Sequence, residues 1–186
     1  MVKELKRQVF HILLGVVLVY LLNRDILNLE ILFGILLIGF VISWVSKDRD
    51  IPGISWFLRH FDREKERLPG YGALTYILGA IIVLGLFRKD IALASIMILA
   101  FGDSFCHFGR FGKVKHPFSN FKFLEGTIIG ILAGTIGASF FISWQAAFFG
   151  ALVAMSVEGL DLFVLKKKID DNLLIPFISA LIISLF

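Results

Sequence analysis

One stretch of the chain, residues 102–117, carries the richest set of potentially reactive side chains in the sequence. Asp103 supplies a carboxylate, and Gly109 and Gly112 allow the backbone to approach a ligand closely. The positive charges of the stretch come from Arg110, Lys113 and Lys115. Glycines, basic side chains and one acidic group are the parts that a metal-bound polyphosphate needs, so the stretch predicts such a site. The alternative is a basic loop with glycine turns on the inner side of a membrane.

Asp103 stands at the end of an apolar run that begins at Ile91. A helix over this run would rise about 18 Å and place the carboxylate in the inner third of a bilayer. A carboxylate at that depth needs a cation. The sequence leaves two cations open: a lysine from a neighbouring helix, or a divalent metal such as Mg²⁺, which suits hard oxygen ligands.

Ionisable residues also begin two of the apolar runs. Arg7 and His11 are four residues apart, so a helix places them on one face together with the nearby Glu4. This face predicts either a ligand site or an interfacial anchor with a histidine bonded to a neighbouring helix. Lys122 and Glu125 are three residues apart at the start of a later run, and we expect them to pair.

The remaining acidic groups lie in the C-terminal third of the chain. Glu158 ends an apolar run, where a capping carboxylate would oppose the helix dipole, so a functional role is favoured. Asp171 and Asn172 open the last run, where such residues commonly cap helices, and Asn172 is the expected cap. Glycines at every fourth position predict tight helix packing rather than a ligand site. They are Gly126, Gly130 and Gly134.

The elements that must position these groups are strongly apolar. Hydrophobic residues make up 58% of the 186 residues and charged residues 18%, against about 45–50% and about 25% in soluble domains. The mean hydropathy is +0.85. These values exclude a soluble globule and a disordered chain. The single cysteine, Cys106, excludes an internal disulfide and a multi-cysteine metal site.

Seven apolar runs predict an all-α, polytopic membrane protein with one transmembrane domain over residues 1–186. The runs are 9–22, 26–45, 73–87, 91–105, 127–142, 144–157 and 173–186. All but three of the 19 lysines and arginines lie at the N-terminus or in the connections 46–72, 106–126 and 158–172. The positive-inside rule therefore predicts a cytoplasmic N-terminus, cytoplasmic connections and an outside C-terminus. The net charge of +4 then reflects these loops rather than nucleic-acid binding.

Taken in order, four motifs resemble those of the dolichol kinase and phytol kinase family of CTP-dependent lipid-alcohol kinases. They are Glu4-x-x-Arg7-Gln8-x-x-His11-x-x-x-Gly15, Gly102-Asp103 leading to Gly109-Arg110-Phe111-Gly112-Lys113, Lys122-x-x-Glu125-Gly126, and Glu158 followed by Asp170-Asp171-Asn172-x-x-x-Pro176. Three positions differ from the family pattern, and the glycine-rich segment is shorter than in phytol kinases. One of the three is Cys106, which replaces a small alanine-like residue. Gln8 stands where lysine is usual, and Phe123 stands where serine or threonine is usual.

The resemblance implies transfer of the CTP γ-phosphoryl group to a long-chain isoprenoid alcohol such as dolichol, phytol or geranylgeraniol. It implies that Asp103 holds Mg²⁺ on the triphosphate, and that Glu158 or Asp171 is a second metal ligand or the base. Lys122 would neutralise phosphate charge, with Glu125 orienting it. The other residues expected to bind the nucleotide or the acceptor are Arg7, His11, Gly109, Arg110, Gly112, Lys113 and Asn172.

Two competing functions remain at this stage. A cytidylyltransferase acting on phosphatidate would bind the same CTP and Mg²⁺ but attack the α-phosphorus. The N-terminal motif and residues 170–172 favour the kinase. A small membrane transporter is the alternative of another class, but a transport path also needs polar groups in mid-membrane, whereas the ionisable residues here gather on one side.

Overall fold

The computed structural model describes residues 2–54, 56, 68–108, 114, 123–160, 163–164 and 167–186. Most of these residues are helical. The helices are α1 (Val2–Asn23), α2 (Leu29–Asp48), α4 (Tyr71–Leu86), α5 (Lys89–Met97), the π-helix η1 (Ile98–Asp103), α6 (Ser104–Phe108), α7 (Leu124–Ala138), α8 (Trp144–Glu158) and α9 (Asp171–Ile183). Two short strands, β1 (Phe163–Val164) and β2 (Lys167–Lys168), precede α9.

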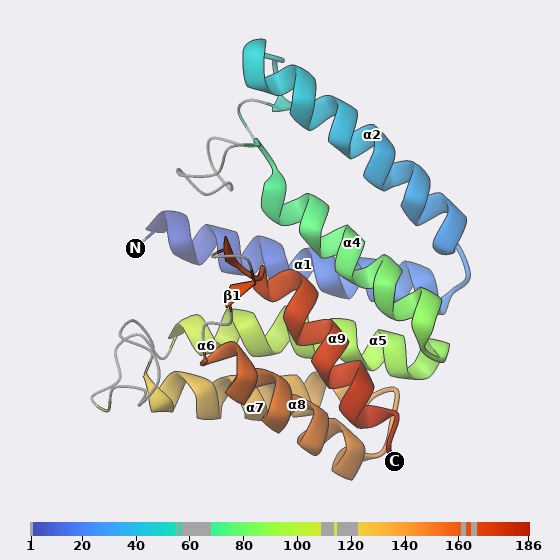
Figure 1. Ribbon diagram of the computed structural model, residues 1–186, viewed down its shortest axis with the longest axis vertical. Helices are drawn as coiled ribbons and strands as arrows, with labels where there is room; N and C mark the ends of the chain where they lie inside the picture. Colours follow the sequence, from blue (N-terminus) through green and yellow to red (C-terminus); the bar gives the residue numbers. More distant parts are fainter. Residues whose placement is uncertain are drawn as a thin grey trace.

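The helix ends that carry the predicted site residues point toward one side of the molecule. Figure 1 shows the start of α1, the ends of α2, α6 and α8, and the starts of α4, α7 and α9 toward the left of the view. The short turns after α1, α4 and α7, together with the C-terminus, lie toward the right. The polar motifs are therefore gathered at one end of the helical assembly.

The centre of the fold is the continuous helical segment formed by α5, η1 and α6. In an 18-residue apolar window within Lys89–His107, 72% of the residues are buried. The helices α1, α4, α7, α8 and α9 pack around η1 or α5, whereas α2 packs mainly against α4. The site residues of η1 and α6 are consequently held by the most enclosed element described.

Close approach of this central segment to α7 depends on glycine. A Cβ atom on Gly130 would lie 2.8 Å from the carbonyl oxygen of Gly102 and 3.0 Å from Cε of Met155. A Cβ atom on Gly134 would lie 3.4 Å from Cγ2 of Ile98. The predicted tight packing is therefore confirmed at Gly130, whereas a Cβ atom on Gly134 would make an ordinary van der Waals contact.

Three described helical segments are long and apolar enough to cross a membrane: Lys3–Asn23, Leu29–Asp48 and Lys89–His107. Three shorter apolar helices accompany them: Tyr71–Leu86, Leu124–Ala138 and Asp171–Ile183. Each of the seven predicted runs coincides with helical structure. Seven membrane crossings and the sidedness of the termini stay predictions.

The structure adds detail to the sequence-based expectation at two places and corrects it at a third. The fourth run is interrupted by η1 instead of continuing as an α-helix. The connection 158–172 contains an antiparallel pairing, with Phe163 opposite Lys168, because β1 and β2 form backbone hydrogen bonds. The N-cap of α9 is Asp170, whose carboxylate accepts the Asn172 backbone N–H at 3.0 Å. Asn172 is therefore inside the helix and is not its cap.

Candidate active site

The start of α1 carries a carboxylate that holds two neighbouring side chains. Oε1 of Glu4 accepts hydrogen bonds from Nη2 of Arg7 at 2.7 Å and from Nε2 of Gln8 at 2.9 Å. Residues three and four apart on a helix share a face, which explains why one glutamate reaches both. Gln8, which replaces the lysine of the resembled motif, thus remains a donor to this carboxylate.

Asp103 and two histidines extend this set of contacts from α1 to the central segment. Oδ2 of Asp103 lies 3.6 Å from Nε2 of His11, and Oδ1 lies 3.6 Å from Nδ1 of His107. Nε2 of His107 lies 3.6 Å from Oε1 of Glu4. We call Glu4, Arg7, His11, Asp103 and His107 the polar cluster. Two of the separated sequence motifs therefore meet in one place, around a carboxylate that is buried.

The π-helix explains how Asp103 comes to face α1. A π-helical turn contains more residues than an α-helical turn and so changes the direction of the side chains that follow it. Gly102 approaches α7 and α8 through Gly130 and Met155, while the next residue, Asp103, contacts His11 on α1. Ser104 fixes the same junction, because its Oγ donates to the Gln8 carbonyl at 3.4 Å. Such π-helical turns are frequent at functional sites.

A second network joins α4 to the start of α9. Nδ2 of Asn172 donates to the Gly72 carbonyl and to Oγ1 of Thr75, both at 3.0 Å. Oγ1 of Thr75 in turn donates to Oδ1 of Asp170 at 3.2 Å. Asn172 is 5% exposed. The network gives Asn172 a structural role, while its predicted role in binding a nucleotide is not tested by these contacts.

The other predicted acidic residues lie on α7, α8 and α9. Glu158 is 1% exposed and lies one turn after Met155, on the side of α8 that packs toward η1. Oε1 of Glu125, in the first turn of α7, accepts the backbone N–H of Val114 at 3.1 Å. Asp171 is in the first turn of α9. Their predicted roles as metal ligand, orienting group or base stay predictions.

Several predicted residues lie outside the described part of the chain. These are Gly109, Arg110, Gly112, Lys113 and Lys122. The charged segment from Asp48 to Arg67, for which the sequence leaves a short interfacial helix and a solvated connector open, is also largely outside it. The expected pairing of Lys122 with Glu125 therefore stays a prediction.

Sequence reasoning overlooked His107. It lies four residues after Asp103, and its Nδ1 is 2.9 Å from the Asp103 carbonyl oxygen. The spacing of four on a helix was the available signal. It was insufficient because the second contact of His107, with Glu4, depends on how α1 and α6 pack.

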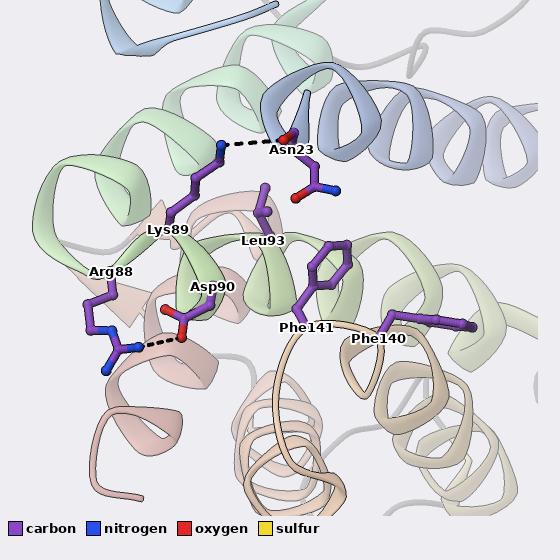
Figure 2. Close-up of a pocket in the computed structure, with 7 residues that line it drawn as sticks. All are labelled: Asn23, Arg88, Lys89, Asp90, Leu93, Phe140 and Phe141. Atoms are coloured by element: carbon purple, nitrogen blue, oxygen red, sulfur yellow. Dashed lines mark hydrogen bonds and ion pairs between the residues drawn. The ribbon is translucent and has the colours of Figure 1, made fainter. Parts of the chain in front are cut away.

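A separate cavity of about 670 Å³ lies at the opposite end of the helices. It is lined by Asn23, Arg88, Lys89, Asp90, Leu93, Phe140 and Phe141. Figure 2 shows Arg88 turned to Asp90 and Lys89 reaching the α1 end at Asn23. The cations here are already paired within the protein, and none of the predicted site residues lines this cavity.

The polar cluster offers a limited set of metal donors. Within the described residues, no group of three or more histidine, cysteine, aspartate or glutamate side chains is arranged to hold a metal ion. Mg²⁺ usually retains water and binds through one or two carboxylates together with substrate phosphates. The enclosed Asp103 carboxylate fits that mode, in which a nucleotide supplies the other ligands.

Comparison with known proteins adds independent information. No family model and no solved structure matches the chain. An uncharacterised protein of Methanocaldococcus jannaschii is 32% identical, with 98% of this chain and 93% of that protein covered. The chain belongs to the same family as this archaeal protein.

Two fungal relatives carry a functional name. A protein of Eremothecium gossypii and one of Saccharomyces cerevisiae, each named CTP-dependent diacylglycerol kinase 1, are both 28% identical to this chain. The matches cover 96% and 97% of this chain, and 65% and 72% of the two relatives. The two matches thus extend over nearly the whole length of this chain.

Proposed function

We propose that this protein is a CTP-dependent lipid kinase that transfers the γ-phosphoryl group of CTP to the hydroxyl of a lipid alcohol. The observation that carries the proposal is the contact of Asp103 with His11, and its link through His107 and Glu4 to Arg7, at one end of an apolar helical assembly. Similarity to two CTP-dependent diacylglycerol kinases over nearly the whole chain supports it. A lipid substrate also agrees with the presence of helices that are long and apolar enough to cross a membrane.

The proposed reaction is phosphoryl transfer, in which the site must neutralise the negative charge of the phosphates. The alcohol oxygen forms a bond to the γ-phosphorus, the bond from that phosphorus to the bridging oxygen breaks, and CDP leaves. The alcohol proton passes to Glu158 or Asp171. Charge on the transferred group is the main demand, and Arg7 with the basic residues Arg110, Lys113 and Lys122 would meet it. Asp103, together with whichever of Glu158 and Asp171 does not act as the base, would hold Mg²⁺, which supplies further positive charge to the phosphates.

The acceptor that we propose first is a long-chain isoprenoid alcohol, on the strength of the four sequence motifs. Diacylglycerol is the second candidate, favoured by the names of the two fungal relatives. Both are membrane-soluble alcohols whose hydroxyl lies at the interface, so both suit a polar cluster at the ends of apolar helices. The two differ in whether the enzyme must accept a single isoprenoid chain or a two-chain glycerol lipid.

We further propose that the protein crosses the membrane several times, with the polar cluster on the cytoplasmic side. The basic residues that flank the helices support this orientation by the positive-inside rule. CTP would then reach the site from the cytoplasm, while the lipid would arrive laterally within the bilayer.

A label-transfer assay on purified protein in lipid nanodiscs tests the proposed activity. CTP labelled at either the γ- or the α-phosphate is supplied with Mg²⁺ and one acceptor: an isoprenoid alcohol, diacylglycerol or phosphatidate. The proposal predicts γ-label in a lipid monophosphate, and the accepting lipid distinguishes the two candidates. Transfer of the α-label to phosphatidate would instead establish a cytidylyltransferase. Absence of lipid label from both donors, with folded protein, would contradict a CTP-dependent reaction.

A further inference from the structure

Tyr76 on α4 has a buried side chain that contacts the polar cluster at His11. The residue is 1% exposed, and its Oη has no hydrogen-bond partner among the described residues. A buried hydroxyl without a partner costs stability, on the order of 1–3 kcal/mol. Phenylalanine would avoid that cost, and this chain uses phenylalanine 20 times against three tyrosines. The hydroxyl therefore needs a reason other than packing.

The ring of Tyr76 packs edge-on against the ring of His11. The ring centroids are 4.7 Å apart and the planes meet at 77°. Nε2 of the same imidazole lies 3.6 Å from Oδ2 of Asp103. Tyr76 and Asp103 thus bound His11 from two different helical elements, and the position of the imidazole depends on both.

Gly15 supplies the space that Tyr76 occupies. A Cβ atom on Gly15 would overlap Oη of Tyr76 and would lie 2.5 Å from Cβ of Ala100. Gly15 is four residues after His11, so it lies on the same face of α1. The side chain of Tyr76 therefore extends along one turn of α1, with its ring at His11 and its hydroxyl at Gly15.

Tyr76 also stands beside the second network. Its neighbour Thr75 accepts the Asn172 amide and donates to Asp170. Two consecutive residues of α4 consequently contact the two separate parts of the candidate site, α9 through Thr75 and α1 through Tyr76. This arrangement fixes the rotation of α4, and with it the depth at which the Tyr76 side chain meets His11.

From these contacts we propose that Tyr76 is a positioning residue for His11, and that Gly15 contributes to this role by leaving space for the Tyr76 hydroxyl. The hydroxyl at Gly15 sets how far the ring reaches along α1, and the ring sets the orientation of the imidazole toward Asp103. The expected effect of Tyr76 on phosphoryl transfer rests on the proposed kinase function. The orientation of the His11 imidazole by Tyr76 does not depend on that function.

Tyr76→Phe removes only the hydroxyl. We expect kcat for phosphoryl transfer to fall about tenfold, because small misplacements of a site group have large effects on rate. The KM for CTP should stay within about twofold, and thermal stability should be unchanged or higher. Tyr20→Phe, which removes a hydroxyl from an exposed side chain on α1, is the matched control and should leave kcat unchanged.

A double-mutant cycle tests whether Tyr76 acts through His11. In a His11→Ala background, Tyr76→Phe should have little further effect on residual kcat, because the group that it positions is gone. An equal loss of kcat in both backgrounds would overturn the proposal, and so would an unchanged kcat in Tyr76→Phe.

A measurement that needs no activity separates this inference from the proposed function. In ¹⁵N-histidine-labelled protein, the His11 imidazole resonances, assigned by their loss in His11→Ala, should shift in Tyr76→Phe and remain unshifted in Tyr20→Phe. A shift without any kinase activity in the wild-type protein would uphold the positioning role and refute the kinase. An unshifted His11 resonance in Tyr76→Phe would overturn the positioning role whatever the activity.

Discussion

Nε2 of His11 lies 3.6 Å from Oδ2 of Asp103, which joins the first helix of the chain to the end of the central π-helix. The contact unites two motifs that are far apart in the sequence. It also gives the enclosed Asp103 carboxylate an imidazole on each side, His11 from α1 and His107 from α6. This relationship makes Asp103 the first residue to test.

Asp103→Asn keeps the size of the side chain and removes its charge. We expect kcat/KM for transfer from CTP to fall about 100-fold or more, since a preorganised charge at such a site has effects of this size. The protein should remain folded by gel filtration in detergent. Asp90→Asn is the matched control, because Asp90 lies at the opposite end in an exposed pair with Arg88. Full activity of folded Asp103→Asn would refute its role.

Glu4→Gln tests the carboxylate that holds Arg7 and Gln8. Loss of its charge should release Arg7 and weaken the contact with His107, so we expect the KM for CTP to rise about fivefold. Steady-state kinetics with varied CTP measures the effect. Glu30→Gln, an exposed change on α2, should leave the KM for CTP unaltered. An unchanged KM in Glu4→Gln would show that the position of Arg7 is unimportant for CTP.

Asn172→Ala distinguishes a structural role of Asn172, through its hydrogen bonds to α4, from a role in binding the nucleotide. It removes two hydrogen bonds to α4 from an enclosed site, and we expect a loss of about 1–3 kcal/mol in stability. Thermal unfolding in detergent should show a midpoint lowered by several degrees, while Asn23→Ala, which changes an exposed side chain, should not. An unchanged midpoint with a raised KM for CTP would instead favour the nucleotide-binding role.

Gly130→Ala and Gly34→Ala form a pair of opposite cases. A methyl group on Gly130 meets the Gly102 carbonyl and Met155, so we expect destabilisation of about 1–3 kcal/mol. A methyl group on Gly34 meets nothing within 4 Å, so alanine should be neutral or stabilise by about 0.5–1 kcal/mol. Thermal unfolding of both variants provides the comparison. Equal midpoints would contradict the tight α7 packing.

The proposed orientation can be tested by cysteine labelling, since Cys106 is the single native cysteine. In a Cys106→Ser background, Lys47→Cys should react with an impermeant maleimide from the cytoplasmic side. Arg24→Cys should react from the other side. Both residues are exposed. Reaction of both from the same side would refute the proposed crossing by α2.

The sequence by itself determined the helical segments and the chemical identity of most candidate site residues. Apolar composition and the spacing of Gly130 and Gly134 are local properties, and a helix converts them directly into a packing face. The position of each helix along the chain could therefore be predicted without knowing its neighbours. The same holds for Arg7 and His11, whose shared face follows from helical geometry alone.

Only the tertiary structure decided which of these groups meet. The π-helical turn directs Asp103 toward His11 while Gly102 contacts α7 and α8, and no local pattern specified that change of direction. Tyr76 resembled any apolar core residue until the packing of α4 placed it against His11 and Gly15. The physical reason is that contacts between helices depend on their relative rotation and depth. Those are set by side-chain packing among residues distant in the sequence.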